Sequence, residues 1–258
     1  MDGHRHSVTS ADGTEIGLLT AGDGPPLLLV HGGMGQIESW QPLWDTLASR
    51  WRVTAMDRRG RGTSGDTAPY RPDKEFQDVA AVAARLGGPV DVFAHSIGAI
   101  FALGAAAAGA PVRRLALYEP PGPQAAPPDW RARMNAMIAA GRPGPAMMSF
   151  LTEIIGLTAE QVSELRNAPR RYDILPTVSA TMPREGQVLA DLDLSALATD
   201  VPVLLILGSA SPAWAREVTG ELAAILPRST LAVLDGQGHD AISSAPAELM
   251  GALGEFFS

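Results

Sequence analysis

Short runs of aliphatic residues recur along this chain and alternate with segments of helical pattern. Each run is apolar at successive positions, which is typical of a strand in a parallel sheet, because helices cover both faces of such a sheet. The runs are Leu27–Val30, Val53–Met56, Val90–Phe93, Leu115–Tyr118, Val203–Leu207 and Leu231–Leu234. The sequence therefore predicts an α/β fold with a mostly parallel sheet that is buried on both faces.

The N-terminal residues predict a different kind of pairing. Ser7–Thr9 and Ile16–Leu19 are β-prone, and Asp12-Gly13 between them is a dipeptide typical of hairpin turns. This hairpin adds two antiparallel strands to the six runs above, which makes an eight-stranded sheet. Helical patterns occur at residues 39–49, 73–86, 97–109, 213–226 and 246–257, with Asp73 and Pro246 as expected starts.

Residues 121–195 interrupt the alternation. The segment begins in a Pro-rich stretch at residues 120–123, and no strand-like run appears before Val203. The simplest interpretation is a helical insertion into a single core domain, which residues 1–120 and 196–258 would form together.

The composition limits the classes of protein. Of the 258 residues, 46% are hydrophobic and 19% charged, so the chain can bury a large core. The formal net charge of -8 gives no sign of a nucleic-acid partner. The absence of cysteine excludes disulfides and thiolate catalysis.

Nothing in the sequence predicts a membrane partner. The N-terminus has no apolar signal segment, and the longest apolar stretch, Ile97–Ala110, is too short to span a bilayer. We therefore expect a cytoplasmic protein. The oligomeric state stays open, with a homodimer among the alternatives.

Ser96 is the candidate nucleophile. The motif Ala94-His95-Ser96-Ile97-Gly98 follows a strand-like run and begins a helical segment. A serine on such a tight strand-to-helix turn projects its hydroxyl beyond the sheet edge, and small residues on both sides let strand and helix approach. A simple helix N-cap is the alternative, which the context disfavours.

Two backbone N–H groups are candidates for an oxyanion hole. Acyl transfer needs donors aimed at the oxygen on which negative charge develops. Ile97 follows Ser96 at a helix N-terminus, and Gly33 lies in His31-Gly32-Gly33-Met34 after another strand-like run. An ordinary Gly-rich turn is the alternative for this second motif.

His239 is the candidate general base. It ends the motif Gly236-Gln237-Gly238-His239, which follows the last strand-like run. The other four histidines are terminal or belong to the motifs above. A loop at this position would reach Ser96, whereas a surface histidine is the alternative.

The segment 57–65, DRRGRGTSG, predicts a turn with several forced backbone conformations. We expect a structural role for it. Its three arginines suggest either an anion site or a solvated surface, and the second is favoured.

The four motifs near residues 31, 57, 94 and 236 resemble those of the α/β-hydrolase superfamily, in the same order and over nearly the whole chain. They look most like its small esterase, lactonase, haloperoxidase-like and C–C hydrolase members. The resemblance implies the α/β-hydrolase fold, with residues 121–195 as a helical cap over the active site. Epoxide hydrolases and haloalkane dehalogenases are disfavoured, because they have Asp at the position of Ser96.

The triad acid departs from the pattern of the family. Most relatives place it after the run Val203–Leu207, but here Ser211 occupies that position and cannot carry a negative charge. Glu119 follows the run Leu115–Tyr118, which ends at the same edge of a parallel sheet. Zearalenone-type lactonases look similar in taking their acid from this place. A contact with the cap hinge or with substrate is the alternative for Glu119.

Three other carboxylates are weaker candidates for the acid. Asp240 adjoins His239, so their side chains should diverge, and Asp235 is also close in sequence. Asp200 precedes its strand and would lie at the wrong end of the sheet.

The resemblance and the residues together predict a Ser96–His239–Glu119 triad that cleaves an ester or lactone and needs no cofactor or metal. The expected partner is a small hydrophobic substrate, since the insertion contains several methionines and a tryptophan and methionine adapts to pockets of irregular shape. Packing of the cap on the core is the alternative. Candidate substrate contacts are Met34, Trp130, Met134, Met137 and Trp214. A C–C hydrolase, a thioesterase, a cyclase and a non-catalytic ligand-binding homologue remain alternatives.

Overall fold

The computed structural model describes residues 1–158, 160–163 and 175–258. An eight-stranded sheet lies at its centre, with the order β1-β2-β4-β3-β5-β6-β7-β8. Its strands are β1 (His4–Thr9), β2 (Glu15–Ala21), β3 (Pro26–Val30), β4 (Arg52–Met56), β5 (Val90–His95), β6 (Val112–Tyr118), β7 (Val203–Gly208) and β8 (Ser229–Leu234). β2 pairs antiparallel with β1 and β4, and the other neighbours are parallel. The predicted α/β fold and the N-terminal hairpin are thus confirmed.

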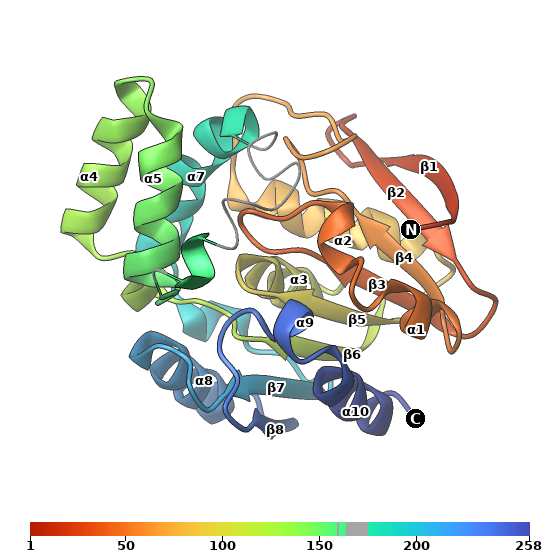
Figure 1. Ribbon diagram of the computed structural model, residues 1–258. Helices are drawn as coiled ribbons and strands as arrows, with labels where there is room; N and C mark the ends of the chain where they lie inside the picture. Colours follow the sequence, from red (N-terminus) through yellow and green to blue (C-terminus); the bar gives the residue numbers. More distant parts are fainter. Residues whose placement is uncertain (159, 164–174) are drawn as a thin grey trace.

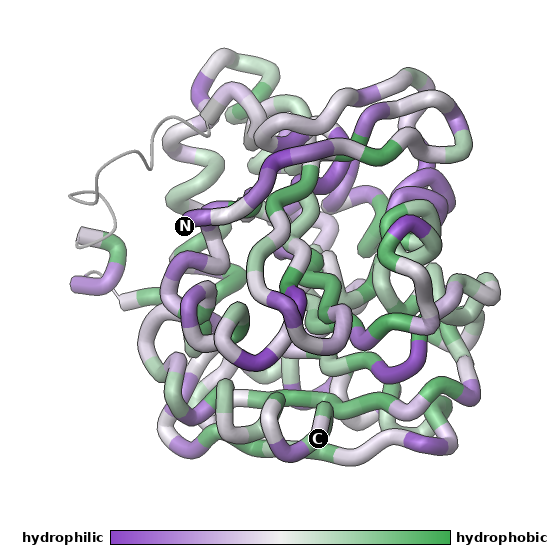
Figure 2. Tube along the Cα trace, turned by 90° about the vertical axis from the view of Figure 1, so that its right-hand side faces the viewer, coloured by the Kyte–Doolittle hydropathy of each residue, from purple (hydrophilic) through white to green (hydrophobic). Residues whose placement is uncertain are grey.

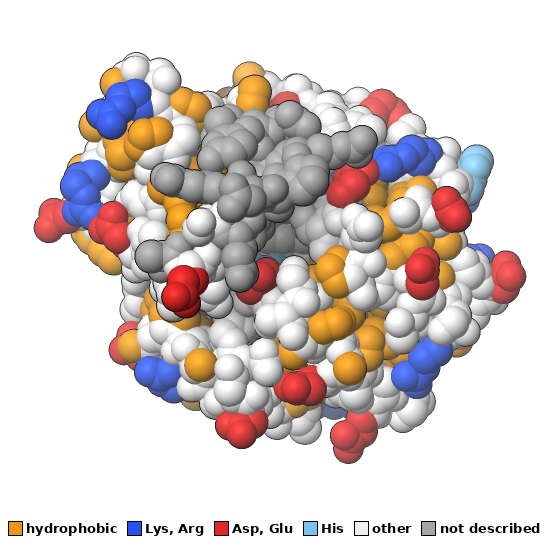
Figure 3. Space-filling model, viewed as in Figure 1, with side chains coloured by type: hydrophobic (Ala, Val, Ile, Leu, Met, Phe, Trp, Pro, Cys, Tyr) orange, Lys and Arg blue, Asp and Glu red, His pale blue; other side chains and the backbone are white. Residues whose placement is uncertain are grey.

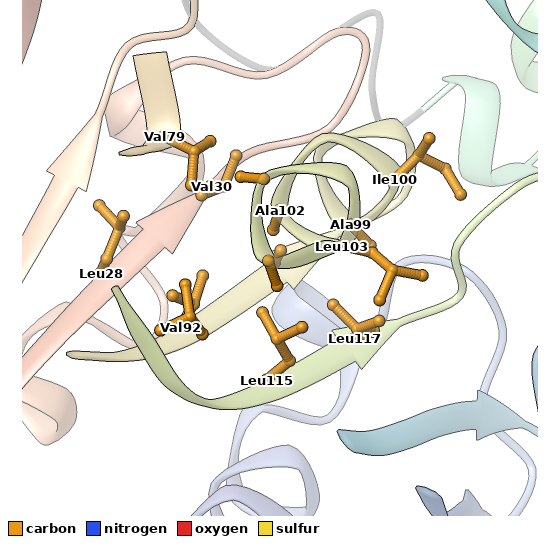
Figure 4. Close-up of a cluster of buried hydrophobic side chains, with 14 of the residues drawn as sticks. Leu28, Val30, Val79, Val92, Ala99, Ile100, Ala102, Leu103, Leu115 and Leu117 are labelled. Atoms are coloured by element: carbon orange, nitrogen blue, oxygen red, sulfur yellow. The ribbon is translucent and has the colours of Figure 1, made fainter. Parts of the chain in front are cut away.

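Helices cover both faces of the sheet (Figure 1). Helices α2 (Pro72–Arg85), α3 (Ile97–Ala107) and α8 (Ala213–Ile225) pack on one face, and α1 (Trp44–Ala48) and α10 (Pro246–Phe256) on the other. Figure 4 shows Leu28, Val92 and Leu115, from three adjacent strands, pointing toward α3. Continuous apolar strands form here because each face meets a helix layer. Figure 2 accordingly shows apolar segments of the chain in the interior of the molecule.

Two predicted helices begin at other residues in the structure, and all five end one or two residues earlier than predicted. The helix expected at 39–49 is divided into a 3₁₀ turn, η1 (Ile37–Trp40), and α1, because Pro42 lacks an N–H group and clashes with a helical carbonyl. Helix α2 begins at Pro72 rather than Asp73, since proline fits the first turn. Helix α10 begins at Pro246 as predicted.

Strand β8 corrects the prediction that every run is covered on both faces. Leu231 and Val233 each remain 54% exposed, whereas Leu234 is buried. β8 is the last strand of the sheet, and α8 packs over its neighbour β7, so among the described helices none covers one side of β8.

Between β6 and β7 the described chain is helical, and we call these helices the insertion. It contains α4 (Pro128–Ala139), α5 (Pro143–Ser149), a π-helical turn, η3 (Phe150–Ile154), and α7 (Leu175–Ala190), flanked by the 3₁₀ turns η2 (Pro123–Ala125) and η5 (Leu194–Leu197). The helices α4, α5 and α7 group at one side of the sheet (Figure 1). The domain boundaries at 121 and 195 stay a prediction. Among the described residues, no helix has the length and apolar character needed to cross a membrane.

Candidate active site

Ser96 lies on a sharp turn between β5 and α3. Its backbone has φ 55° and ψ -134°, a strained conformation for a residue with a side chain. Gly98 makes the turn feasible, because a Cβ there would lie 2.7 Å from the carbonyl oxygen of Val30. Ile97 is the first residue of α3, so its N–H has no acceptor within the helix. This geometry is that of a nucleophile elbow.

The glycine loop after β3 passes directly beside this elbow. A Cβ on Gly32 would lie 2.9 Å from the Cβ of Ser96, and a Cβ on Gly33 would lie 3.8 Å from the Ile97 side chain. Glycine is therefore needed at position 32, whereas a Cβ at position 33 would make only ordinary contact with Ile97. The structure thus brings together the two backbone segments that were predicted to supply oxyanion donors.

His31 fixes the shape of the glycine loop. Its Nε2 accepts a hydrogen bond from the backbone N–H of Arg58 at 3.0 Å, so Nδ1 carries the proton and donates to the Gly32 carbonyl at 2.9 Å. Burial and the Arg58 guanidinium hold the pKa of His31 well below its usual range. His31 is therefore a neutral structural residue.

Glu119 contacts the ring of His239. The carboxylate Oε2 lies 2.6 Å from His239 Nδ1, and Glu119 is 0% exposed. Its Oε1 accepts the backbone N–H of Gly208 at 2.8 Å and the hydroxyl of Ser211. Ser211 thus donates to the Glu119 carboxylate. With Nδ1–H directed at a carboxylate, Nε2 of His239 is left as the basic nitrogen.

Two further side chains hold the loop that carries His239. The Tyr118 hydroxyl donates to the Gly238 carbonyl and accepts the N–H of Ala241 at 3.0 Å. His95 Nε2 lies 3.1 Å from the His239 carbonyl oxygen, and the two rings are 4.7 Å apart. Burial, with the nearby His239, lowers the pKa of His95, so a neutral His95 donates this bond. Sequence reasoning missed both roles, although Tyr118 directly precedes Glu119.

Two cavities meet at Ser96. One, of about 190 Å³, is bordered by both Ser96 and His239. The other, of about 50 Å³, continues from Ser96 under the insertion and has mostly apolar walls. Of the predicted substrate contacts, Met34, Trp130 and Trp214 line this second cavity. Met134 and Met137 belong to the hydrophobic cluster that also contains Trp130 and Trp214, but they do not line this cavity.

Comparisons with known proteins agree with this architecture. Residues 27–252 match the family model described as "Alpha/beta hydrolase family". The chain belongs to the alpha/beta hydrolase family. A crystal structure of an alpha/beta hydrolase from Sphaerobacter thermophilus is similar over 98% of this chain and 100% of that one, with a TM-score of 0.86 and 37% identity.

Relatives with named activities are more distant. A 104-residue segment is 38% identical to an N-formylmaleamate deformylase from Pseudomonas putida, and it spans only 39% of each chain. An enol-lactonase from Burkholderia xenovorans covers 98% of this chain and 99% of its own length with a TM-score of 0.74, but at 18% identity this likeness shows the fold alone.

The arginines of the 57–65 segment are buried, which corrects the prediction of a solvated surface. Arg58 and Arg59 are 1% and 0% exposed. Arg58 pairs with Glu75 and Glu185 at 2.8 Å each, and Arg59 pairs with Asp78 at 2.7 Å. The charges are satisfied within the protein, as buried charges must be. On the face shown in Figure 3, the acidic and basic side chains of the described surface are interspersed.

Asp57, the first residue of the 57–65 segment, has the predicted structural role. Its carboxylate accepts the backbone N–H of Ile37 at 2.9 Å and that of Thr63 at 2.8 Å. Burial raises its pKa. Among the described residues, no group of three or more His, Asp or Glu is arranged to hold a metal ion.

Proposed function

We propose that this protein is a serine hydrolase that cleaves an ester or lactone of a small, largely apolar substrate through an acyl-enzyme. The observation that carries the proposal is the 2.6 Å contact between the buried Glu119 carboxylate and His239 Nδ1. It orients a basic histidine in the wall of the cavity that Ser96 also borders. A nucleophile, a base and an orienting acid are thus available in one place.

In the proposed first half-reaction, His239 Nε2 removes the hydroxyl proton of Ser96 while the oxygen attacks the substrate carbonyl. The N–H groups of Gly33 and Ile97 stabilise the oxyanion that forms. His239 then donates its proton to the leaving alkoxide, and the C–O bond breaks. In the second half-reaction His239 deprotonates a water molecule, whose oxygen attacks the acyl carbonyl. The bond to the Ser96 oxygen then breaks, His239 returns the proton to that oxygen, and the carboxylic acid product leaves. Throughout, the Glu119 carboxylate stabilises the imidazolium.

The walls of the smaller cavity support an apolar substrate. They include Trp130, Ile154, Met182 and Trp214, and a pocket of this kind favours apolar groups through burial of their surface. The fold-level likeness to an enol-lactonase and the partial match to a deformylase are both compatible with hydrolysis at a carbonyl.

Labelling with a fluorophosphonate tests the proposal directly. We expect one label per wild-type chain and none in Ser96→Ala, because the probe reacts only with an activated serine. Ser209→Ala, which removes an exposed hydroxyl near the same sheet edge, is the matched control and should label normally. An unlabelled wild-type protein would contradict the proposal and favour a ligand-binding homologue.

Assays then test the substrate class. We expect turnover of p-nitrophenyl butyrate and of a simple lactone, both abolished in Ser96→Ala. Cleavage of a 1,3-diketone in the absence of ester turnover would favour a C–C hydrolase instead.

A further inference from the structure

Glu185 is a carboxylate at the wall of the smaller cavity that the proposed mechanism does not use. It lies on α7 in the insertion and is 7% exposed. It borders the cavity together with Gly33, Ser96 and Ile97, whereas most of the other lining side chains are apolar. A charged side chain in such a place needs a reason, because desolvation of a carboxylate is costly.

The two oxygens of Glu185 have different surroundings. Oε1 accepts hydrogen bonds from Arg58 at 2.8 Å and from Arg61 at 2.9 Å. Oε2 is within 3.1 Å of the position that a Cβ on Gly33 would occupy. Among the residues that the structure describes, none donates a hydrogen bond to Oε2. One oxygen is thus committed to the core, and the other is available beside the loop that carries the proposed oxyanion donor.

The local charges exclude a cationic ligand for this oxygen. Arg58 and Arg61 carry two positive charges, and Glu75 and Glu185 carry two negative charges in the same buried network. Burial opposes ionisation of Glu185, but the Arg61 and Arg58 guanidiniums outweigh it and lower the pKa of its carboxyl. The network is balanced, so an added ammonium would bring an uncompensated charge into an apolar cavity. A neutral O–H donor adds a hydrogen bond without adding charge.

We propose that Glu185 is a specificity-determining residue whose Oε2 accepts a hydrogen bond from a hydroxyl of the substrate, close to the scissile carbonyl. The inference rests on the proposed hydrolase function and narrows its substrate class to hydroxy esters or hydroxylated lactones. The hydroxyl lies near the carbonyl because Gly32 adjoins Ser96 and the next residue, Gly33, adjoins Glu185.

Hydrolysis of three matched esters tests the assignment. The probes are the p-nitrophenyl esters of butyrate, 3-hydroxybutyrate and 3-methoxybutyrate. At carbon 3 the first has no polar group, the second has a hydroxyl that can donate a hydrogen bond, and the third has an ether oxygen that can only accept one. In the wild type we expect kcat/KM for the hydroxy ester to exceed that for the methoxy ester by roughly tenfold to a hundredfold, as for a hydrogen bond to a charged group.

Glu185→Gln should remove most of this preference. Arg58 and Arg61 require an acceptor at the Oε1 position, so the amide oxygen must lie there and the NH₂ group must face the cavity. A donor then replaces an acceptor, and the hydroxy-to-methoxy ratio should fall from its wild-type value by most of the expected factor of roughly ten to a hundred. Size affects the ratio equally in both proteins and cancels in this comparison.

Glu75→Gln is the matched control, because it weakens the same network through Arg58 but does not border the cavity. It should keep the wild-type ratio. If it loses the ratio as Glu185→Gln does, Glu185 acts only as a link between insertion and core, and the inference is wrong. Thermal unfolding of both variants establishes that the ratios come from folded protein.

The wild-type assay separates the two proposals even if neither variant folds. Turnover of butyrate without a preference for the hydroxy ester would overturn the role of Glu185 alone. Failure to cleave any of the three esters, together with failure to bind the fluorophosphonate, would overturn the proposed function itself.

Discussion

The ends of β6 and β7 differ in what they contribute to the site, although the strands are parallel neighbours in register, with Tyr118 beside Ile206. Glu119, a carboxylate, directly follows β6, and Ser211, a hydroxyl, lies in the loop that follows β7. Both side chains nevertheless reach the same point, because the Ser211 hydroxyl is hydrogen-bonded to Glu119 Oε1. If Glu119 is the triad acid, the position of the charge relative to the histidine ring matters more than the strand that carries it, and we expect that either strand end could supply it.

Among the variants that test this difference between the strand ends, Glu119→Gln should cause the largest loss of kcat. The Gln oxygen should lie toward the Gly208 N–H and the Ser211 hydroxyl, which places its NH₂ group against His239 Nδ1. That arrangement forces the proton onto Nε2, so the histidine cannot accept the proton of Ser96. We expect kcat for p-nitrophenyl butyrate to fall by about 10³- to 10⁴-fold, as for a triad acid replaced by its amide. Circular dichroism should show an unchanged fold, and a loss of less than tenfold would argue against Glu119 as the acid.

Moving the acid to the other strand end is a stricter test. We expect Glu119→Ser alone to be nearly inactive and the double variant Glu119→Ser/Ser211→Asp to recover roughly tenfold to a hundredfold in kcat. The reason is that the position 211 side chain already reaches the oxygen of the buried carboxylate. Steady-state kinetics of both variants and of the wild type provide the measurement. If the double variant is no better than the single one, the two strand ends are not interchangeable.

Tyr118→Phe tests whether β6 also holds the histidine loop. The change leaves the Gly238 carbonyl and the Ala241 N–H without their shared partner. Two lost hydrogen bonds in a buried region should lower the free energy of unfolding by about 1–3 kcal/mol, measured by denaturant titration. We expect kcat to fall about tenfold, since a displaced imidazole costs rate even when the residue itself is intact. Unchanged stability would show that His95 alone suffices to hold the loop.

The sequence predicts the central sheet and the Glu119 position for the same physical reason. Both depend only on which residues follow one another over a short stretch of the chain. A run of apolar residues specifies a buried strand, and the residue after it must lie at the carboxyl edge. The surroundings of Arg58 depend instead on Glu75 and on Glu185, a partner 127 positions away, so no local pattern could reveal them. The exposure of Leu231 likewise depends on which strand ends the sheet, which the hydropathy of the run does not contain.

Ser211→Ala is the smallest expected change and completes the comparison. Glu119 keeps its contact with His239 Nδ1 and its bond from the Gly208 N–H, so the acid loses only one of three partners. A hydrogen bond to a charged group contributes roughly 1.5–3 kcal/mol, but only the part that changes between ground state and transition state affects the rate. We expect kcat to fall less than tenfold, whereas the free energy of unfolding decreases by most of the bond's value. A Ser211→Ala effect on kcat as large as that of Glu119→Gln would mean that the hydroxyl at the end of β7, and not the carboxylate at the end of β6, controls the histidine.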